Sequence, residues 1–210
     1  DGFMHLGMRD MSALRDGFSR IIIGHTDDIH KVIMRIGDLE DSQVYDFSFR
    51  AKLTDNATFI GDTVYVTGDV QSTENLVIDS RLLRIESQNE HNPGGQPDAG
   101  LSARTINLNV DEQLLLQGWI RGVDVVDVRV TQTDVTGNAD NFVSILGVPN
   151  SITTDLGSSI TTSAVGASLT VSGSQSLRIS GLMKTLERNS TMAVAAGTQL
   201  NMYSGGNFIA

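Results

Sequence analysis

One stretch of the chain decides the fold: Asp62-Thr-Val-Tyr-Val-Thr-Gly68-Asp-Val70. Apolar and polar residues alternate in it, which is the period of a half-buried β-strand, and a glycine interrupts the alternation before Val70 resumes it. The same pattern recurs in Glu112-Gln-Leu-Leu-Leu-Gln-Gly118-Trp-Ile120 and in Gln175-Ser-Leu-Arg-Ile-Ser-Gly181-Leu-Met183. We therefore expect structural turns between short strands at Gly68, Gly118 and Gly181.

The spacing of these glycines indicates stacked coils. They lie 50 and 63 residues apart (118 − 68 and 181 − 118), which leaves room for two or three turns of about 20 residues each. Two of the three repeats extend upstream, because Ile106 and Leu169 each open an alternating run 12 residues before the glycine (118 − 106 and 181 − 169). We expect an all-β, right-handed parallel β-helix, a solenoid whose inward residues are Val64, Val66, Val70, Leu114, Leu116, Ile120, Leu177, Ile179 and Met183. The predicted outward residues are Tyr65, Leu115 and Arg178.

A β-sandwich could show the same alternation and is the alternative fold. The runs are only three to five residues long, with Gly, Asn or Ser at the corners, and they do not form clear hairpin pairs. The best hairpin signal, Thr136-Gly137-Asn138, is neither Asn-Gly nor Asp-Gly. Aromatic residues make up only 5 % of the chain, which suits a narrow interior filled by Val, Ile and Leu. These features favour the solenoid.

Composition narrows the class of protein. The chain has no cysteine and a net charge of −10, so its fold depends on its core, its backbone ladders or bound ions, and we expect no nucleic-acid partner. No apolar stretch approaches the roughly 18 residues of a membrane span, so we expect no membrane insertion. Because the sequence begins at Asp1, it reads as a processed chain or as a piece of a longer one.

The N-terminal part carries a family resemblance. Asp16-Gly-Phe-Ser-Arg-Ile-Ile-Ile-Gly24 repeats the Asp-Gly-Phe opening of Asp1-Gly-Phe3. It resembles the recurring segments of giant bacterial surface proteins of the filamentous-haemagglutinin-like adhesin type, in which such a segment precedes β-helical coils. The resemblance is close over residues 16–25 and departs from the family pattern at residues 25–30. It implies a β-helical fold, an extracellular or cell-surface location and a role as fibre, stalk or adhesin, and it brings no catalytic residues.

The same patterns divide the chain. Residues 1–50 are predicted to form an N-terminal entry, capping or linking region, and residues 51–210 the β-helical coils. Residues 88–100 contain two of the three prolines and are predicted to form an exposed loop.

Few residues suggest chemistry. His25, Asp27, Asp28 and His30 are capable of binding metal, but a solvated acidic turn explains them better. A glycine-containing stretch offers oxygen ligands for Ca²⁺, although it matches no known calcium loop and Asp and Asn are also common in turns; its candidate ligands are Asp134, Asn138, Asp140 and Asn141. We predict no resident cofactor, with Ca²⁺ as the single alternative.

An enzyme is the other possibility for such a fold. Polysaccharide-cleaving chemistry needs paired carboxylates, and Asp124 and Asp127 are the candidates. Asp127 alternates with Val126 and Val128 beside Arg129, so surface charge explains it better. We predict that the protein is not an enzyme.

The remaining predictions concern contacts. Trp119 is expected to face outward, where a loop covers it or a partner contacts it. The C-terminal end stays apolar and strand-like, so we expect the chain to pair end to end with other copies or with adjoining repeats of a longer chain. The predicted function is a non-catalytic structural or adhesive segment of a bacterial fibre, and the alternative is a carbohydrate-binding or carbohydrate-cleaving β-helix with an extracellular polysaccharide as partner. The predicted interface residues are Trp119, Leu200, Met202, Tyr203, Phe208 and Ile209.

Overall fold

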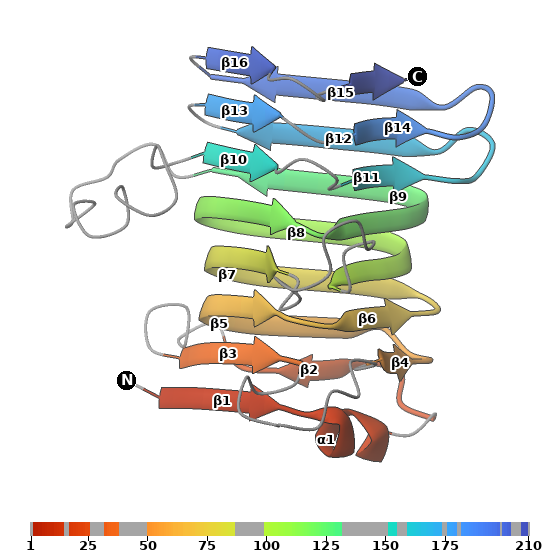
Figure 1. Ribbon diagram of the computed structural model, residues 1–210. Helices are drawn as coiled ribbons and strands as arrows, with labels where there is room; N and C mark the ends of the chain where they lie inside the picture. The colour runs from red at the N-terminus through yellow and green to blue at the C-terminus, as the bar shows by residue number, and fades with distance from the viewer. Residues whose placement is uncertain are drawn as a thin grey trace, which may run out of the picture.

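Parallel strands wind around one core in the computed structural model of the chain (Figure 1). Strands at the front of Figure 1 run left to right, strands behind them return right to left, and the chain climbs from bottom to top, so the coil is right-handed. Every pairing between described strands is parallel, which confirms the parallel β-helix and excludes the sandwich for this part of the chain. The structure describes residues 2–14, 17–25, 32–37, 50–86, 99–131, 151–154, 159–173, 176–179, 182–197, 199–202 and 207–209.

The strands form three ladders, and four long strands turn corners and so belong to more than one ladder. These four are β5 (Ala57–Val66), β7 (Asn75–Glu86), β8 (Gly100–Gln117) and β9 (Trp119–Val130). Ladder 1 contains β1 (Gly2–Leu6), β3 (Val32–Ile36), residues 63–66, 82–86 and 113–117, β10 (Ser151–Thr154), β13 (Ser176–Ile179) and β16 (Gln199–Met202). Ladder 2 contains β4 (Arg50–Leu53), β6 (Asp69–Ser72), residues 100–103 and 119–122, β11 (Ser159–Thr162), β14 (Leu182–Thr185) and β17 (Asn207–Ile209). Ladder 3 contains β2 (Ile21–Ile23), residues 57–61, 75–80, 105–110 and 125–130, β12 (Ser168–Gly173) and β15 (Thr191–Ala196).

The strand register confirms the repeat read from the sequence. Val64 pairs with Leu83 and Leu83 with Leu114, and Leu114 in turn reaches Leu177 through Ile152. Each predicted repeat is therefore two coil steps from the next, with one coil between them. The shortest coil has 19 residues (83 − 64), and the longer ones carry insertions at their corners.

The core consists of stacked aliphatic columns. Alternation places every second side chain of a strand inside, and the in-register pairing sets each on its equivalent one coil away. The predicted inward residues whose side chains are described are all buried, namely Val64, Val66, Val70, Leu114, Leu116, Ile120, Leu177 and Met183. The side chains of Arg178 and Ile179 lie outside the described residues.

The predicted outward residue Leu115 lies in the same column as Tyr65 and Arg84, but its side chain is not exposed. Leu115 alternates with the inward Leu114 and Leu116, yet it is only 4 % exposed. Its column neighbours Arg84 and Tyr65 are half-buried, and the Arg84 guanidinium lies 5.5 Å from the centre of the Tyr65 ring. The outer face of ladder 1 is therefore partly covered at these coils, and alternation does not predict that cover.

The described part of residues 1–50 belongs to the same solenoid. Strands β1 and β3 start ladder 1, and helix α1 (Met8–Ala13) lies between β1 and β2 in chain order, where a strand of ladder 2 would otherwise stand. The helix contacts β4 and buries Met11 in the core (Figure 1). It thus covers the core at this end of ladder 2.

The opposite end of the described coils is open. In β12, Leu169 and Val171 are buried, whereas their partners in β15, Met192 and Val194, are only half-buried. Leu200, which pairs with the buried Leu177, is 46 % exposed. Inward side chains become exposed here because no further described coil covers them.

The predicted loop at residues 88–100 ends earlier than the sequence indicated. Gly100 begins β8, and both Ala99 and Gly100 are buried. Residues 87–98 lie outside the described part of the chain, as do residues 132–150, which contain the hairpin signal at Thr136-Gly137-Asn138.

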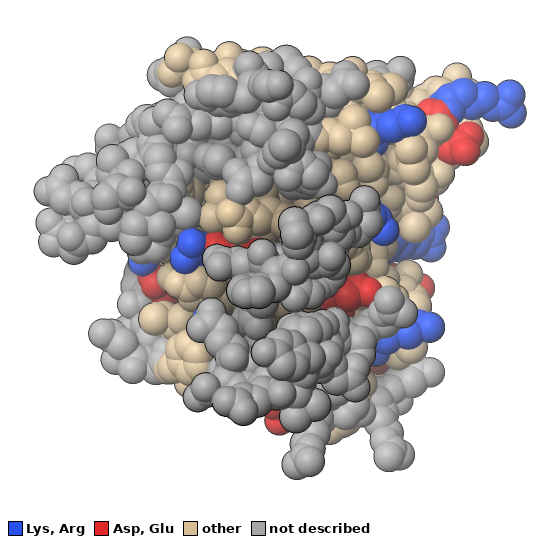
Figure 2. Space-filling model, viewed as in Figure 1, with Lys and Arg blue, Asp and Glu red and all other residues tan. Residues whose placement is uncertain are grey.

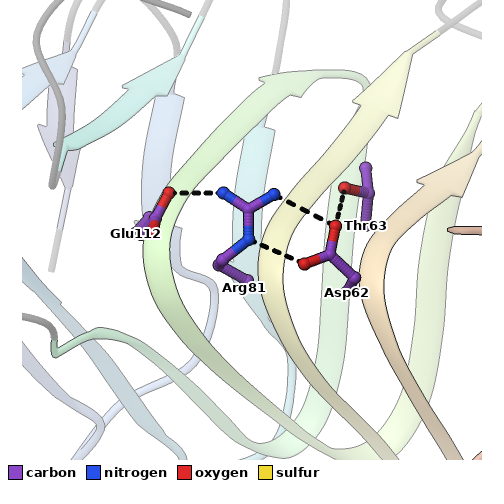
Figure 3. Close-up of polar contacts among 4 residues, drawn as sticks. All are labelled: Asp62, Thr63, Arg81 and Glu112. Atoms are coloured by element: carbon purple, nitrogen blue, oxygen red, sulfur yellow. Dashed lines mark hydrogen bonds and ion pairs between the residues drawn. The ribbon is translucent and has the colours of Figure 1, made fainter. Parts of the chain in front are cut away.

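Ion pairs join successive coils at their corners. Arg81 donates hydrogen bonds from Nε and Nη2 to the carboxylate of Asp62, at 2.7 and 3.0 Å, and from Nη1 to Glu112 Oε2 at 2.7 Å (Figure 3). Thr63 Oγ1 donates a further hydrogen bond to Asp62 Oδ2, at 3.0 Å. The three charged residues come from β5, β7 and β8, so this ion triad connects three coils. Hydrogen bonding to Asp62 raises the pKa of Arg81 above its usual range, although burial opposes the shift.

A β-bulge places one carboxylate of the triad. Ser80 pairs with Val110 and Leu82 with Gln113, so two residues of β8 stand opposite Arg81 alone. A second bulge sets Val123 and Asp124 opposite Arg104, and Arg104 Nε lies 2.7 Å from Asp124 Oδ2. At both corners the second of the two bulged residues, Glu112 or Asp124, is acidic and forms an ion pair with the arginine of the preceding coil.

Candidate functional site

The residues considered for catalysis are held in ion pairs. Asp124 accepts a hydrogen bond from Arg104, and Asp127 accepts hydrogen bonds from Arg129. The pairing of Asp127 with Arg129 on the outer face of β9 is the one expected from the alternation. Hydrogen bonds to these carboxylates raise the pKa values of Arg104 and Arg129. Each carboxylate thus faces its own arginine and not the other carboxylate.

The metal-site predictions fall mostly outside the described residues. This is so for all four Ca²⁺ candidates (Asp134, Asn138, Asp140 and Asn141) and for Asp27, Asp28 and His30; His25 is described and exposed. Within the described ranges, no cluster of three or more His, Asp or Glu residues could hold a metal ion. The same ranges contain no helix of the length and apolarity needed to cross a bilayer.

Two of the three predicted turn glycines, Gly68 and Gly118, lie at corners between ladders 1 and 2. Gly68 and Gly118 are buried, and their carbonyl groups accept hydrogen bonds from Gly100 and Ser159 of the next coils. A side chain at position 118 would bring its Cβ to 2.2 Å from the carbonyl oxygen of Ala99, so only glycine fits that corner. Gly181 lies outside the described residues.

Half of the predicted interface residues lie at the open end. Leu200 and Ile209 are exposed there, and Phe208 is half-buried against the core. Tyr203 and the side chain of Met202 are outside the described part. Trp119 lies elsewhere, on the outer face of ladder 2.

A groove runs along that outer face. Successive coils stack in register, so side chains that alternate outward form an axial column. Before it reaches Ile209, this column contains Lys52, Gln71, Ser102, Arg121, Thr161 and Lys184. All of these except Lys184 line a groove of about 460 Å³. Its side toward ladder 3 is formed by Thr73, Arg104, Val123, Ser163 and Leu186. We call this feature the ladder 2 groove.

Trp119 and Gly100 position the central cation of the groove. Gly100 pairs with Trp119, and a Cβ at position 100 would lie 2.1 Å from Trp119 Cδ2. The indole therefore rests directly on the bare backbone of the coil below. The Arg121 guanidinium carbon lies 4.5 Å from the centre of the Trp119 ring, within the range of a cation–π contact. A glycine in one coil thus makes room for an aromatic platform that orients Arg121.

The groove is cationic although the chain is acidic. Lys52, Arg104 and Arg121 line it, and none of its described lining residues is an Asp or Glu. Arg104 is neutralised by Asp124, but no described carboxylate forms an ion pair with Lys52, Arg121 or Lys184. Figure 2 shows blue atoms recurring along the right-hand side of the molecule, where Figure 1 places β4, β6 and β14, with some red atoms among them.

Trp119 was predicted from the sequence as an outward contact residue, but the groove beside it was not predicted. Arg121 stands two residues after Trp119 and so shares its face, which alternation could have indicated. The other members come from separate coils and meet only through the register. Serine, threonine, glutamine, lysine and arginine side chains of this kind can bind a ligand through hydrogen bonds and charge.

Comparisons with protein-family models, with curated proteins and with solved structures returned no match for this chain. The resemblance of residues 16–25 to giant adhesins therefore stays an expectation. Fold and site define the class: a right-handed parallel β-helix with a cation-lined lateral groove.

Proposed function

We propose that this chain is a non-catalytic structural and adhesive segment of a secreted or cell-surface bacterial fibre. The observation that carries the proposal is the unbroken stacking of three parallel ladders around a single aliphatic core. In such a stack every coil satisfies the backbone groups of its neighbours, and more coils lengthen the structure without changing its design. This is the property that a stalk or fibre needs.

The two ends of the described solenoid differ, and this difference favours the addition of further coils at the end formed by β15, β16 and β17. At the open end, β15, β16 and β17 pair with the preceding coil, and Leu200, Met192 and Phe208 offer incompletely covered apolar surface to a further coil. At the other end, α1 covers ladder 2, and among the described strands β1 pairs with β3 alone and β2 with β5 alone. A next coil therefore docks most readily on the open end.

Removal of residues 198–210 tests this role. We expect the truncated protein to keep most of its far-ultraviolet β-signal, because only the last half-coil is lost, and to form shorter filaments or none in electron micrographs. Leu200→Lys should act in the same direction by placing a charge on the open coil. Leu186→Lys is the matched control, since Leu186 is equally exposed but lies on the side of the solenoid. Wild-type protein that stays monomeric at high concentration would contradict end-to-end assembly.

The absence of catalysis is a separate expectation. Asp124 and Asp127 are each engaged by an arginine, so neither is free to act as the acid or base of a carboxylate pair. We expect no lyase or hydrolase turnover on acidic polysaccharides, measured by release of reducing ends, and no functional change in the Asp124→Asn, Asp127→Asn double variant. Turnover that this double variant abolishes would establish an enzyme.

A further inference from the structure

We propose that the ladder 2 groove binds an extended anionic polysaccharide, with the polymer lying along the axis of the solenoid. This inference rests on the adhesive part of the proposed function and names the class of ligand that the protein would bind. Its basis is the combination of a groove, a column of cations without described ion-pair partners, and a glycine–tryptophan–arginine arrangement that fixes the central cation.

The spacing of the cations suits an extended polymer. Lys52 and Arg121 are three coil steps apart in the register, and Arg121 and Lys184 are two steps apart. Coils stack at the strand spacing, so these steps correspond to about 14 and 10 Å along the axis. One coil step is close to the length of one sugar ring in an extended polysaccharide. A polymer along the groove can therefore meet each cation with a charged group, while hydroxyl groups of the intervening rings face the neutral positions between the cations.

The intervening side chains match sugar hydroxyl groups. Gln71, Ser102 and Thr161 stand between the cations in the same column, and Thr73 and Ser163 border it. Amide and hydroxyl groups both donate and accept hydrogen bonds, as sugar hydroxyl groups do. The cations of the column are separated by two and then by one neutral polar position, which fits a polymer that carries both acidic groups and hydroxyl groups along its length.

Arg121 is held in place before any ligand binds. Its guanidinium lies over the Trp119 ring, and the ring rests on Gly100. An arginine ordered in this way loses less side-chain entropy on binding and keeps its fork of N–H donors available for a carboxylate or sulfate. We therefore expect Arg121 to contribute more to binding than the unsupported Lys52 and Lys184.

Other polymers fit the groove less well. A peptide gains most of its affinity by adding a strand to a free sheet edge, but the backbone of ladder 2 is paired on both sides along the groove. Single-stranded nucleic acid relies on several aromatic platforms, whereas Trp119 is the one aromatic beside the groove among the described residues and already carries Arg121.

Titration calorimetry with purified chain tests the proposal. The probes are polygalacturonate as the carboxylate polymer, heparin as the sulfated one, dextran as the neutral one, and oligothymidylate and polyglutamate as the other polyanions. We expect saturable binding to polygalacturonate or heparin. The comparison of the two affinities shows whether the groove prefers carboxylate or sulfate groups. We expect no binding to dextran and weaker binding to oligothymidylate and polyglutamate.

Variants locate the site. Arg121→Gln should weaken binding about tenfold or more, and it should lower the slope of log affinity against log salt by about one. The Lys52→Gln, Lys184→Gln double variant should weaken binding by a smaller factor. Arg129→Gln is the matched control, because it removes an exposed arginine from ladder 3 with the same change in charge, and its affinity should equal that of the wild type.

Several results would overturn the groove proposal: no binding to either anionic polysaccharide, equal losses in Arg121→Gln and Arg129→Gln, or tighter binding to oligothymidylate or polyglutamate. Electron micrographs of the same preparations separate this test from that of the fibre. Filaments without binding would reject the groove alone. Binding by a protein that never assembles would leave the groove standing and reject end-to-end assembly.

Discussion

Replacing Phe59 by alanine should lower the free energy of unfolding by about 3–5 kcal/mol. Phe59 is the largest fully buried side chain of the described core and pairs with Ile23 and Ile78 of the adjacent coils. In a stacked core the layers above and below are held by their own backbone ladders, so they cannot collapse into the cavity. Urea unfolding followed by circular dichroism measures the loss.

The effect should also be local. Each coil of a solenoid contacts its nearest neighbours, so hydrogen exchange should accelerate most in β2, β5 and β7. Phe18→Ala is the matched control, because it deletes the same atoms from a side chain that is 54 % exposed, and it should change the stability by less than about 1 kcal/mol. Equal losses in the two variants would mean that Phe59 does not support the core.

The sequence predicted the inner face of the solenoid well, because burial there follows one rule. A side chain that alternates inward meets its equivalents in the neighbouring coils, so the apolar pattern of a single strand suffices. The register of Val64, Leu114 and Leu177 was predicted in this way although the coils between them were not all recognised. Residues 82–86 and 151–154 occupy the intervening coils, and neither has a glycine at the position equivalent to Gly68.

The outer face was harder to predict, because its neighbours are set by coil lengths that vary. The step from Ser102 to Arg121 is 19 residues (121 − 102), but the step from Arg121 to Thr161 is 40 (161 − 121). A constant repeat length therefore no longer predicts the next residue of the column once a coil carries an insertion. The groove, the contact of Trp119 with Gly100 and the burial of Leu115 all depend on such steps, and none of them follows from the pattern of one strand.

The ion pairs at the corners are indicated by the sequence more weakly than the core is. Asp62 and Arg81 are 19 residues apart (81 − 62), and Arg104 and Asp124 are 20 apart (124 − 104), which are coil-length separations between opposite charges. Glu112 does not show this coil-length separation, because an insertion and a bulge place it 31 residues from Arg81 (112 − 81). Corner charges can be read from sequence only where the coil between them is short.

The ion triad has the second-largest expected effect on stability. Arg81→Met should cost about 2 kcal/mol, because it leaves the partly buried carboxylates of Asp62 and Glu112 facing each other without their shared cation. The pKa of Arg81 is higher in the folded chain than in the unfolded one. While Asp62 and Glu112 are ionised, its stabilising effect is therefore complete below the ordinary pKa of arginine, and titration of Arg81 removes the effect as the pH rises through the folded value.

Geometry as well as charge should matter at this corner. Arg81→Lys keeps the charge, but a single ammonium group cannot form the two parallel hydrogen bonds to Asp62 and also reach Glu112, so we expect it to recover only part of the loss. Arg129→Met is the matched control, since the Arg129 side chain is 56 % exposed and its pair with Asp127 lies within one strand, and it should change the stability by at most about 0.5 kcal/mol. Equal effects of Arg81→Met and Arg129→Met in urea unfolding would show that the triad does not hold the three coils together.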